Sequence, residues 1–289
     1  MTVSAEAPAA IGAGGYDWLA IWRAMYDAEH AQTEALVGAQ RARTPDRWAG
    51  KAGRYARSSG RAAQPDAFMR AMLPYLRPTD TVLDIGAGAG RHALFLANQV
   101  AQVVAVEPSA SMRQHLEQRL DAANANNVIV TPVPWPSADV PASDVAICAH
   151  VAYGVREIGP FLTAMNAAAR RACFVLLGFR QPSFVLAPFW EYIYDTPRRP
   201  LPGALECFSA LHQLGLPARF DLLPASPFTF ADRNEALEDL RWRLYLPEEE
   251  SSDTRLLAAI GDLVKHDAAG RCVPQNQPAH VALLWWFVK

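Results

Sequence analysis

The sequence predicts an α/β fold built on a doubly wound, mostly parallel sheet. From Thr81 onward, short apolar runs typical of buried strands alternate with segments whose apolar residues recur at helical spacing. The first such unit places a strand, a glycine-rich turn, a helix and a second strand within residues 81–107. Because strand–helix–strand units of this kind pack as right-handed crossovers, repeating them produces a parallel sheet with helices on both faces.

The individual elements follow from local patterns. Runs rich in Val, Ile and Leu, separated by Pro, Gly and Asn, predict strands at 81–85, 102–106, 128–130, 144–151, 172–177, 219–223 and 281–288. Apolar residues at steps of three and four predict helices near 16–37, 66–76, 91–98, 109–120, 158–165, 232–245 and 254–266. Asp232 and Glu235 have the spacing of a capping box, which predicts where the helix near 232–245 begins.

Composition divides the chain into regions. Residues 1–15, rich in Ala, Gly and Pro, are expected to form a flexible tail, and residues 16–77 an N-terminal helical cover. Residues 78–289 are expected to form the main domain. Within it, residues 181–217 contain six prolines and an aromatic cluster. This stretch is too long for an ordinary loop, so we expect a helical insertion that covers the site as a lid.

Two arginines, Arg198 and Arg199, follow the aromatic cluster of this insertion. One interpretation is that they contact an anionic small molecule beneath the lid. The other is that they are surface residues beside a proline-rich loop.

Charge and cysteine usage limit the class of protein. The 289 residues carry a formal net charge of −2, which argues against a nucleic-acid-coating surface. The sequence lacks an apolar run of membrane-spanning length and the basic, apolar start of a signal peptide. The four cysteines show no Cys-x-x-Cys spacing, so buried, reduced thiols are expected. Together these features predict a cytoplasmic protein that does not contact membranes.

The turn after the first predicted strand carries the clearest functional signal. Gly86, Gly88 and Gly90 follow Asp84 at steps of two, and a helix begins directly afterwards. Glycine tolerates positive φ and lets a ligand approach the backbone, and the helix N-terminus offers free N–H groups. Glu107 ends the second strand, close to where such a site needs an acceptor for ribose hydroxyls. The alternative for Glu107 is a solvated acid at a strand end.

The pattern Asp-x-Gly-x-Gly-x-Gly resembles motif I of the class I S-adenosylmethionine-dependent methyltransferases. It departs from the dinucleotide fingerprint G-x-G-x-x-G, whose third glycine would fall on Arg91. The resemblance covers about residues 46–180. It implies a Rossmann-like sheet of seven strands, with the last strand antiparallel beside the fifth. It also implies S-adenosylmethionine as cofactor and S-adenosylhomocysteine as product. No metal is expected, because the histidines do not cluster at the spacing of metal ligands.

The resemblance assigns roles to the residues of the motif. Asp84, Gly86, Gly88 and Gly90 match the part of motif I whose backbone holds the methionyl group. Glu107, followed by Pro108, matches the acid that accepts hydrogen bonds from both ribose hydroxyls.

Three further residues lie where the resembled family contacts its cofactor. Met112 falls where a side chain often packs on adenine, although an ordinary helix-face methionine is an equal alternative. Trp135 lies in the loop where many relatives carry an acid that reads adenine; this chain has none there, and Trp135 is expected to stack on the purine instead. Tyr55, in a Trp-x-x-x-Ala-x-x-Tyr segment that starts at Trp48, is expected either to touch the ligand or to pack a helix on the sheet edge.

His150 ends the fourth predicted strand, at the sheet edge where open α/β sheets bind ligands. In the resembled family this edge faces the methyl group, so His150 is a candidate general base for a hydroxyl or amine acceptor, and also a cofactor contact. Tyr153, three residues later, is a second candidate catalytic residue. The alternative is that His150 only shapes the pocket or binds backbone.

The expected function is methyl transfer to a small-molecule acceptor through an O, N or S nucleophile. The Asn/Asp-Pro-Pro-Tyr/Phe motif of amino-group methylation is absent after the fourth strand, which argues against a nucleic-acid substrate. One alternative is a non-catalytic module that binds S-adenosylmethionine or a related nucleoside. Another, disfavoured by the missing third glycine, is an NAD(P) oxidoreductase.

Overall fold

The computed structural model describes residues 15–41, 48 and 65–289. Residues 1–14 of the expected tail and Tyr55 lie outside the described residues. The division into tail, helical cover and main domain therefore stays a prediction.

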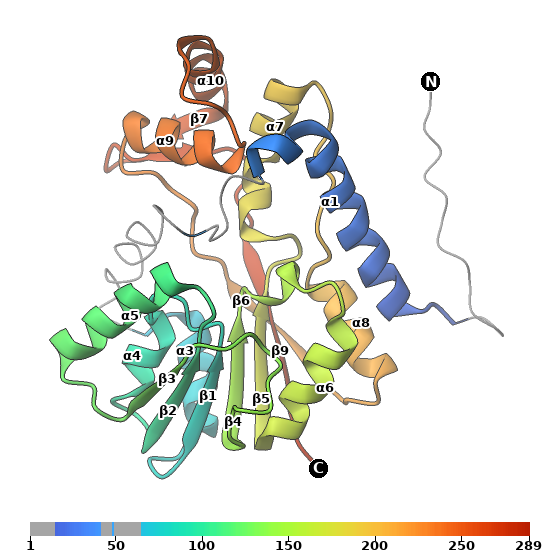
Figure 1. The fold of residues 1–289 in the computed structure, drawn as a ribbon, viewed down its shortest axis with the longest axis vertical. Helices are drawn as coiled ribbons and strands as arrows, with labels where there is room; N and C mark the ends of the chain where they lie inside the picture. Colours follow the sequence, from blue (N-terminus) through green and yellow to red (C-terminus); the bar gives the residue numbers. More distant parts are fainter. Residues whose placement is uncertain (1–14, 42–47, 49–64) are drawn as a thin grey trace.

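A seven-stranded sheet in the order β3-β2-β1-β4-β5-β9-β6 forms the centre of the molecule (Figure 1). Its strands are β1 (Thr81–Ile85), β2 (Gln102–Val106), β3 (Val128–Thr131), β4 (Ser143–Ala149), β5 (Ala169–Leu177), β6 (Arg219–Pro224) and β9 (His280–Phe287). The first five strands pair in parallel, and β9 pairs antiparallel with both β5 and β6. This confirms the expected Rossmann-like sheet, including the antiparallel last strand beside the fifth.

The strand order reverses between β1 and β4. From β1 the chain builds outward through β2 and β3, and β4 then starts the other half on the opposite side of β1. At such a reversal the loops after the two strands leave in opposite directions and open a crevice at their carboxyl ends, where ligands bind in open α/β sheets. We call the carboxyl ends of β1 and β4, with the turns that follow them, the switch point.

Helices cover both faces of the sheet because neighbouring residues of each strand point to opposite sides. Val82 packs in one core cluster with residues of α3 (Ala67–Met72), α4 (Arg91–Leu96) and α5 (Ala110–Ala123). Leu83 packs in the other, with residues of α1 (Trp18–Arg41), α6 (Ile158–Ala168) and α8 (Ala204–Gln213). A short 3-10 helix, Leu73–Tyr75, follows α3 at Pro74.

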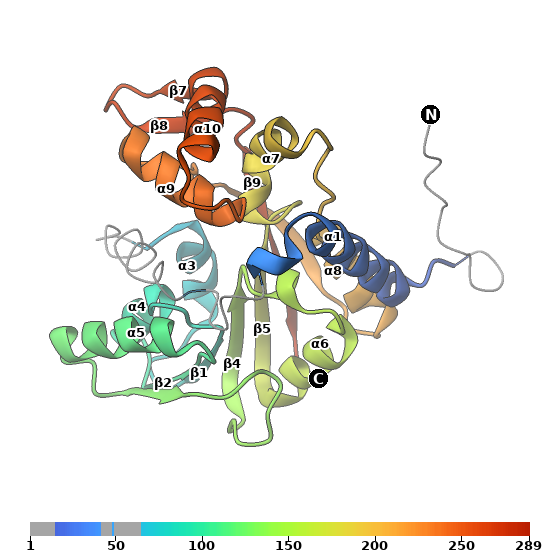
Figure 2. The same ribbon diagram turned by 45° about the horizontal axis from the view of Figure 1, so that its top comes forward.

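A smaller unit, here called the upper lobe, lies beyond the carboxyl ends of the parallel strands (Figure 2). It contains a 3-10 helix (Pro182–Leu186), α7 (Ala187–Tyr194), α9 (Arg233–Arg243), α10 (Glu250–Leu263) and a two-stranded sheet of β7 (Val264–His266) and β8 (Cys272–Pro274). These elements share a core of their own, around Phe189, Trp190, Leu240 and Leu256. The upper lobe therefore combines one segment after β5 with another between β6 and β9.

Two expectations about this part of the chain need correction. The helix expected to reach residue 266 ends at Leu263, because Val264 is extended and pairs antiparallel with Pro274. The stretch 181–217 was expected as one insertion, but α7 packs in the upper lobe, whereas α8 packs on the sheet against α1. Whether any of it acts as a lid stays a prediction.

Two further observations concern the described part of the chain. None of its helices combines the length and the apolar character that crossing a membrane requires. The four cysteines are buried free thiols.

Candidate active site

The three positions of the turn between β1 and α4 require glycine for different structural reasons. All have positive φ: 73° at Gly86, 56° at Gly88 and 81° at Gly90. A Cβ at Gly86 would collide with Val151, and one at Gly90 with Leu116. At Gly88 a Cβ would meet no described atom within 4 Å. Two of the glycines are thus required by packing, whereas at Gly88 no described residue occupies the space from which a ligand could approach the backbone.

Glu107 connects this turn to the start of α5. Its Oε2 accepts a hydrogen bond from the Gly88 N–H at 2.8 Å, and its Oε1 accepts one from the Ser109 N–H at 2.8 Å. The residue is only 7% exposed, so the alternative of a solvated strand-end acid is wrong. The next residue, Pro108, directs its carbonyl to the Arg113 guanidinium at 2.7 Å. The carboxylate thus lies against the open position at Gly88.

Asp84 is a buried carboxyl on β1, on the same face of the sheet as Val82 and α4. Burial raises its pKa to about 6; the charge of Glu107 acts in the same direction, and His92 opposes it. Among the described residues, none hydrogen-bonds its Oδ2. A carboxylate kept in such a position carries an unfavourable charge, which a cationic ligand nearby would stabilise.

His150 and Tyr153 form a hydrogen-bonded pair just beyond β4. His150 has φ 60°, and its N–H donates to the Leu176 carbonyl at 2.9 Å. Its Nδ1 lies 3.2 Å from the Tyr153 hydroxyl, and this hydroxyl accepts a hydrogen bond from the Gly178 N–H after β5. The structure thus brings together the two candidate catalytic residues and connects the ends of β4 and β5.

His150 is an exposed residue in the described chain. Desolvation, reinforced by the positive charges of His92 and Arg91, lowers its pKa to about 4, with Asp66 opposing. Exposed surface together with desolvation is expected for a side chain that lines a hollow. The imidazole is therefore neutral at pH 7.

Met112 and Trp135 lie on opposite sides of the sheet. Met112 is buried and packs with Ala89 of the glycine turn and with Trp48. The Trp135 indole Nε1 donates to the Phe161 carbonyl of α6 at 3.3 Å, and its ring packs on the sheet core. Contacts of Met112 and Trp135 with adenine stay predictions.

Trp48 links the glycine turn to the upper lobe. Besides packing on Ala89 and Met112, its ring lies 5.9 Å, centroid to centroid, from the Trp242 ring of α9. Trp48 begins the segment that was expected either to touch the ligand through Tyr55 or to pack a helix on the sheet edge, and the structure places Trp48 against the turn.

Several residues that support the site carried no clear signal in the sequence. Arg119 of α5 donates to the Ala89 carbonyl at 2.6 Å. Asp66 caps α3 and also pairs with Arg91 Nη2 at 2.9 Å and His92 Nε2 at 3.2 Å. Burial raises the pKa of Asp66, but hydrogen bonding and charge from His92, with help from Arg91, hold it well below its usual value. Apart from the cap of α3, these contacts join residues at least 25 positions apart, so local spacing gave no indication of them.

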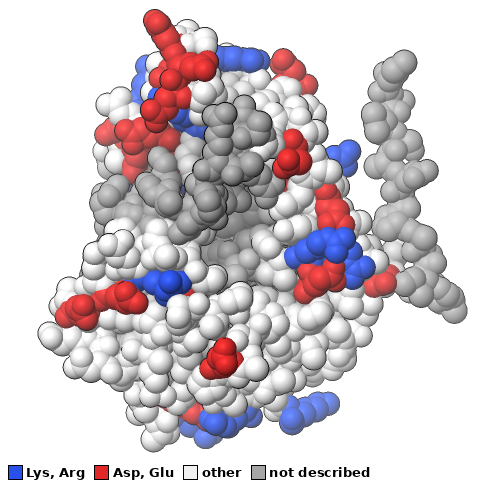
Figure 3. Space-filling view, viewed as in Figure 1, with Lys and Arg blue, Asp and Glu red and all other residues white. Residues whose placement is uncertain are grey.

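In Figure 3 the described side chains beside the recess between the sheet and the upper lobe are mostly uncharged. The carboxyl ends of the parallel strands face this region, since β5 runs directly from the sheet toward α7 of the upper lobe. Across the described ranges, no group of three or more His, Cys, Asp or Glu side chains is placed to hold a metal ion.

Comparison with known proteins agrees with this geometry. A family model described as a methyltransferase domain matches residues 82–171, from β1 into β5. No curated protein matches the sequence.

Similar solved structures share the fold at low sequence identity. One is the magnesium protoporphyrin IX methyltransferase of Synechocystis PCC 6803, crystallised with S-adenosylhomocysteine bound. It is 16% identical with a TM-score of 0.51, covering 65% of this chain and 94% of that one. Another is a putative methyltransferase from Bacillus halodurans, 13% identical with a TM-score of 0.50, covering 75% of this chain and 97% of that one.

The matched segment contains the glycine turn, Glu107 and His150, and the sheet has the expected order with an antiparallel strand beside β5. The sequence match thus identifies residues 82–171 as similar to a methyltransferase domain, and the solved structures show that the chain shares the Rossmann-like fold of methyltransferases.

Proposed function

We propose that this protein binds S-adenosylmethionine at the glycine turn and transfers its methyl group to a small-molecule acceptor. The observation that carries the proposal is the open position at Gly88, bordered by the Glu107 carboxylate. A backbone without a Cβ lets a ligand lie against it, and an ionised carboxylate can accept further hydrogen bonds from hydroxyl groups.

The residues around the turn fit the chemistry of this cofactor. We assign the ribose hydroxyls to Glu107 and the methionyl group to the backbone around Gly88. The negative charges of Asp84 and Glu107 favour a ligand that carries an ammonium and a sulfonium group. When bound, the cofactor supplies a methyl group already activated for displacement.

The protein's part in the reaction is then mainly to position the two reactants. An acceptor in the recess would approach from the end of β4, where His150 lies. Alignment of the nucleophile with the methyl group and exclusion of water can supply much of the acceleration. We propose a small molecule, methylated on O, N or S, as the acceptor.

Calorimetric titration with S-adenosylhomocysteine, S-adenosylmethionine and NADH tests the cofactor assignment. We expect micromolar binding of the first two and no binding of NADH. Binding of NADH alone would contradict the proposal and favour an oxidoreductase. Binding of the first two without methyl transfer to any acceptor in a broad screen would favour the non-catalytic alternative.

Substitution of Gly88 locates the site, and Gly215 offers a matched control. Gly215, beyond the end of α8, has φ 76° and also borders open space, so Gly88→Ala and Gly215→Ala introduce the same backbone strain. We expect each to lower the free energy of unfolding by about 1–2 kcal/mol. Only Gly88→Ala should weaken S-adenosylhomocysteine binding, by at least about tenfold. Equal affinities of the two variants would place the cofactor elsewhere.

A further inference from the structure

Tyr153 and His150 make a chain of hydrogen bonds whose direction is determined by its buried end. The chain starts at the Gly178 N–H, a backbone group that can only donate, and the Tyr153 hydroxyl oxygen accepts from it. Tyr153 is 5% exposed, and burial raises the pKa of its hydroxyl, which therefore keeps its proton.

The proton of the Tyr153 hydroxyl needs an acceptor of its own. In the part of the chain that the structure describes, His150 Nδ1, at 3.2 Å, is the one acceptor paired with the Tyr153 hydroxyl. If His150 Nδ1 carried a proton, the hydroxyl would accept two hydrogen bonds and its own proton would remain buried without a partner, which is unfavourable. The arrangement that satisfies every group has Tyr153 donating to an unprotonated Nδ1.

We propose that Tyr153 is a positioning residue that holds neutral His150 in the tautomer with the proton on Nε2, so that His150 donates a hydrogen bond to the acceptor and does not act as its base. A neutral imidazole carries one proton, and the hydrogen bond at one nitrogen determines which nitrogen keeps it. With Nδ1 occupied by Tyr153, the nitrogen left to meet an acceptor molecule is a donor.

This inference rests on the proposed function and narrows its substrate class. A donor at this position selects an acceptor with a carbonyl or carboxylate oxygen near the atom that is methylated. The desolvation that lowers the pKa of His150 agrees with this role, since a weakly basic imidazole is a poor proton acceptor at pH 7. Arg91 and His92 of α4 oppose protonation of His150, and Asp66 beside α3 favours it.

Two contacts of the neighbouring backbone hold His150 and Tyr153 in position. Val151, the residue after His150, packs against the glycine turn at Gly86, so the start of this segment is held at the switch point. Gly178 has no room for a side chain, because a Cβ there would collide with the Arg180 carbonyl and approach the Tyr153 hydroxyl. Its N–H therefore remains directed at Tyr153.

Two-bond ¹H–¹⁵N NMR spectra of histidine-labelled full-length protein test the proposal without any ligand. The His150 signals are assigned by their loss in His150→Gln. For the wild-type protein at pH 7 we expect a protonated Nε2 and an unprotonated Nδ1, with one tautomer in excess by about tenfold. The reverse tautomer would overturn the proposal and restore His150 Nε2 as a candidate base.

Tyr153→Phe removes the fixing hydroxyl, and Tyr194→Phe is the matched control. The Tyr194 hydroxyl donates to the Leu244 carbonyl in the upper lobe, so its loss also removes a partly buried tyrosine hydrogen bond. We expect Tyr153→Phe to bring the two tautomers to comparable populations and Tyr194→Phe to leave His150 unchanged. An unchanged tautomer ratio in folded Tyr153→Phe would contradict the role of Tyr153, and the wild-type spectrum decides the tautomer even if this variant does not fold.

The NMR result on the His150 tautomer can be distinguished from the calorimetric result on cofactor binding. Calorimetry with S-adenosylhomocysteine reports on the glycine turn, whereas the NMR spectra report on the His150–Tyr153 pair. If S-adenosylhomocysteine does not bind but His150 carries its proton on Nε2, only the proposed cofactor site is contradicted. The reverse tautomer with intact binding would contradict this inference alone.

Discussion

Glu29 and Asp84 are both buried carboxylic acids, but their surroundings differ. Glu29 lies on α1, where its Oε1 contacts Arg198 Nη2 at 3.2 Å and Thr33 Oγ1 at 3.3 Å. The Arg198 guanidinium also lies over the Trp190 ring, 4.9 Å from its centroid. Asp84, at the switch point, forms no salt bridge with any described residue, and burial raises its pKa.

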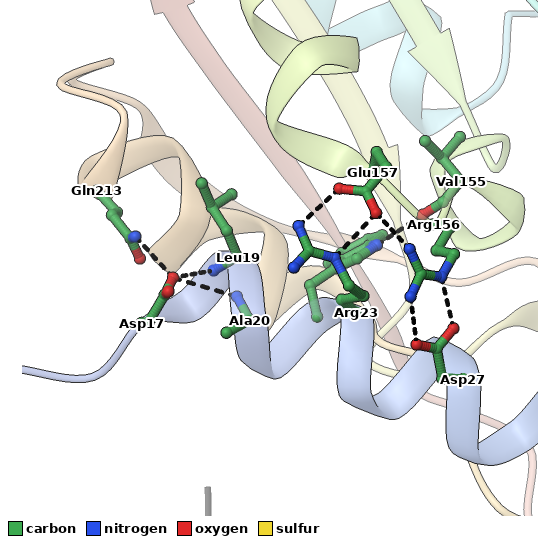
Figure 4. Close-up of polar contacts among 10 residues, drawn as sticks. Asp17, Leu19, Ala20, Arg23, Asp27, Val155, Arg156, Glu157 and Gln213 are labelled. Atoms are coloured by element: carbon green, nitrogen blue, oxygen red, sulfur yellow. Dashed lines mark hydrogen bonds and ion pairs between the residues drawn. The ribbon is translucent and has the colours of Figure 1, made fainter. Parts of the chain in front are cut away.

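Glu29 belongs to the contact between α1 and the body of the protein, here called the α1 seam, and further charged residues of this contact are also paired. Figure 4 shows its exposed part, where Arg23 pairs with Glu157 and Arg156 pairs with Asp27, each at 2.7 Å. The partners in these pairs are more than 100 residues apart in the sequence. The α1 seam thus pairs its charges across the contact between α1 and the body.

The difference indicates what each region is built for. A buried charge with a partner is compatible with a purely structural role, whereas an unpaired buried carboxyl lowers stability unless something compensates for it. Unpaired, perturbed groups cluster at functional sites, where stability is exchanged for a ligand interaction. The switch point has such a group in Asp84, whose Oδ2 has no hydrogen-bond partner among the described residues.

Arg198→Met should produce the largest effect, because it leaves the Glu29 carboxylate buried without its main partner. We expect a loss of about 3–5 kcal/mol in the free energy of unfolding, measured by urea denaturation at pH 7. Arg199→Met, which removes the neighbouring exposed arginine, should change stability little. The double variant Glu29→Met, Arg198→Met should recover most of the loss. Additive losses in the double variant would show that Arg198 acts through packing rather than through the ion pair.

Asp84→Asn should increase the free energy of unfolding at neutral pH, whereas Arg198→Met should decrease it. The folded protein raises the pKa of Asp84 from its ordinary 3.8 to about 6, so the native state binds this proton more tightly than the unfolded state. The stability contributed by this proton is present below pH 4 and is lost as the pH rises through 6. The Asn variant should therefore match the wild type below pH 4 and exceed it by about 2–3 kcal/mol above pH 7.

Thermal or urea unfolding of the wild type and the Asn variant between pH 3.5 and 8 gives the stability of each as a function of pH. Calorimetry with S-adenosylmethionine shows what the Asp84 charge contributes to binding. We expect the more stable Asn variant to bind the cationic cofactor more weakly. A variant that is less stable than the wild type at pH 7 would show that Asp84 is compensated in the folded state. The switch point would then not differ from the α1 seam.

The sequence predicts what depends on neighbouring residues. β2 has the expected bounds, and the glycines adopt the positive φ that their spacing suggested, because strand propensity and turn chemistry are local. Local patterns do not report which distant faces meet. Arg198 is therefore neither of the two things expected of it: it is a buried partner of Glu29, 169 residues away.

The same reasoning explains what was missed at the candidate site. His150 was expected, from its position at a strand end, either to act as a base or only to shape the pocket or bind backbone, and its role stays a prediction. Its contact with Tyr153, and the contact of Tyr153 with the Gly178 N–H after the next strand, could not be predicted from local sequence. The strands β7 and β8 were missed because three residues are too few to establish a period.

Arg23→Ala should have the smallest effect and completes the comparison. Arg23 and Glu157 are both 44% exposed by side chain, so water and salt screen their attraction, and ordering two long side chains opposes it. We expect a change in the unfolding midpoint close to measurement error in low salt, and none in 0.5 M NaCl. Trp22 of α1, which donates to the Val155 carbonyl at 2.7 Å from within the core, should hold the helix in place without this pair. A large, salt-insensitive loss would mean that the exposed part of the α1 seam behaves like the buried Glu29–Arg198 pair, and charge pairing would then no longer distinguish the two depths of the seam.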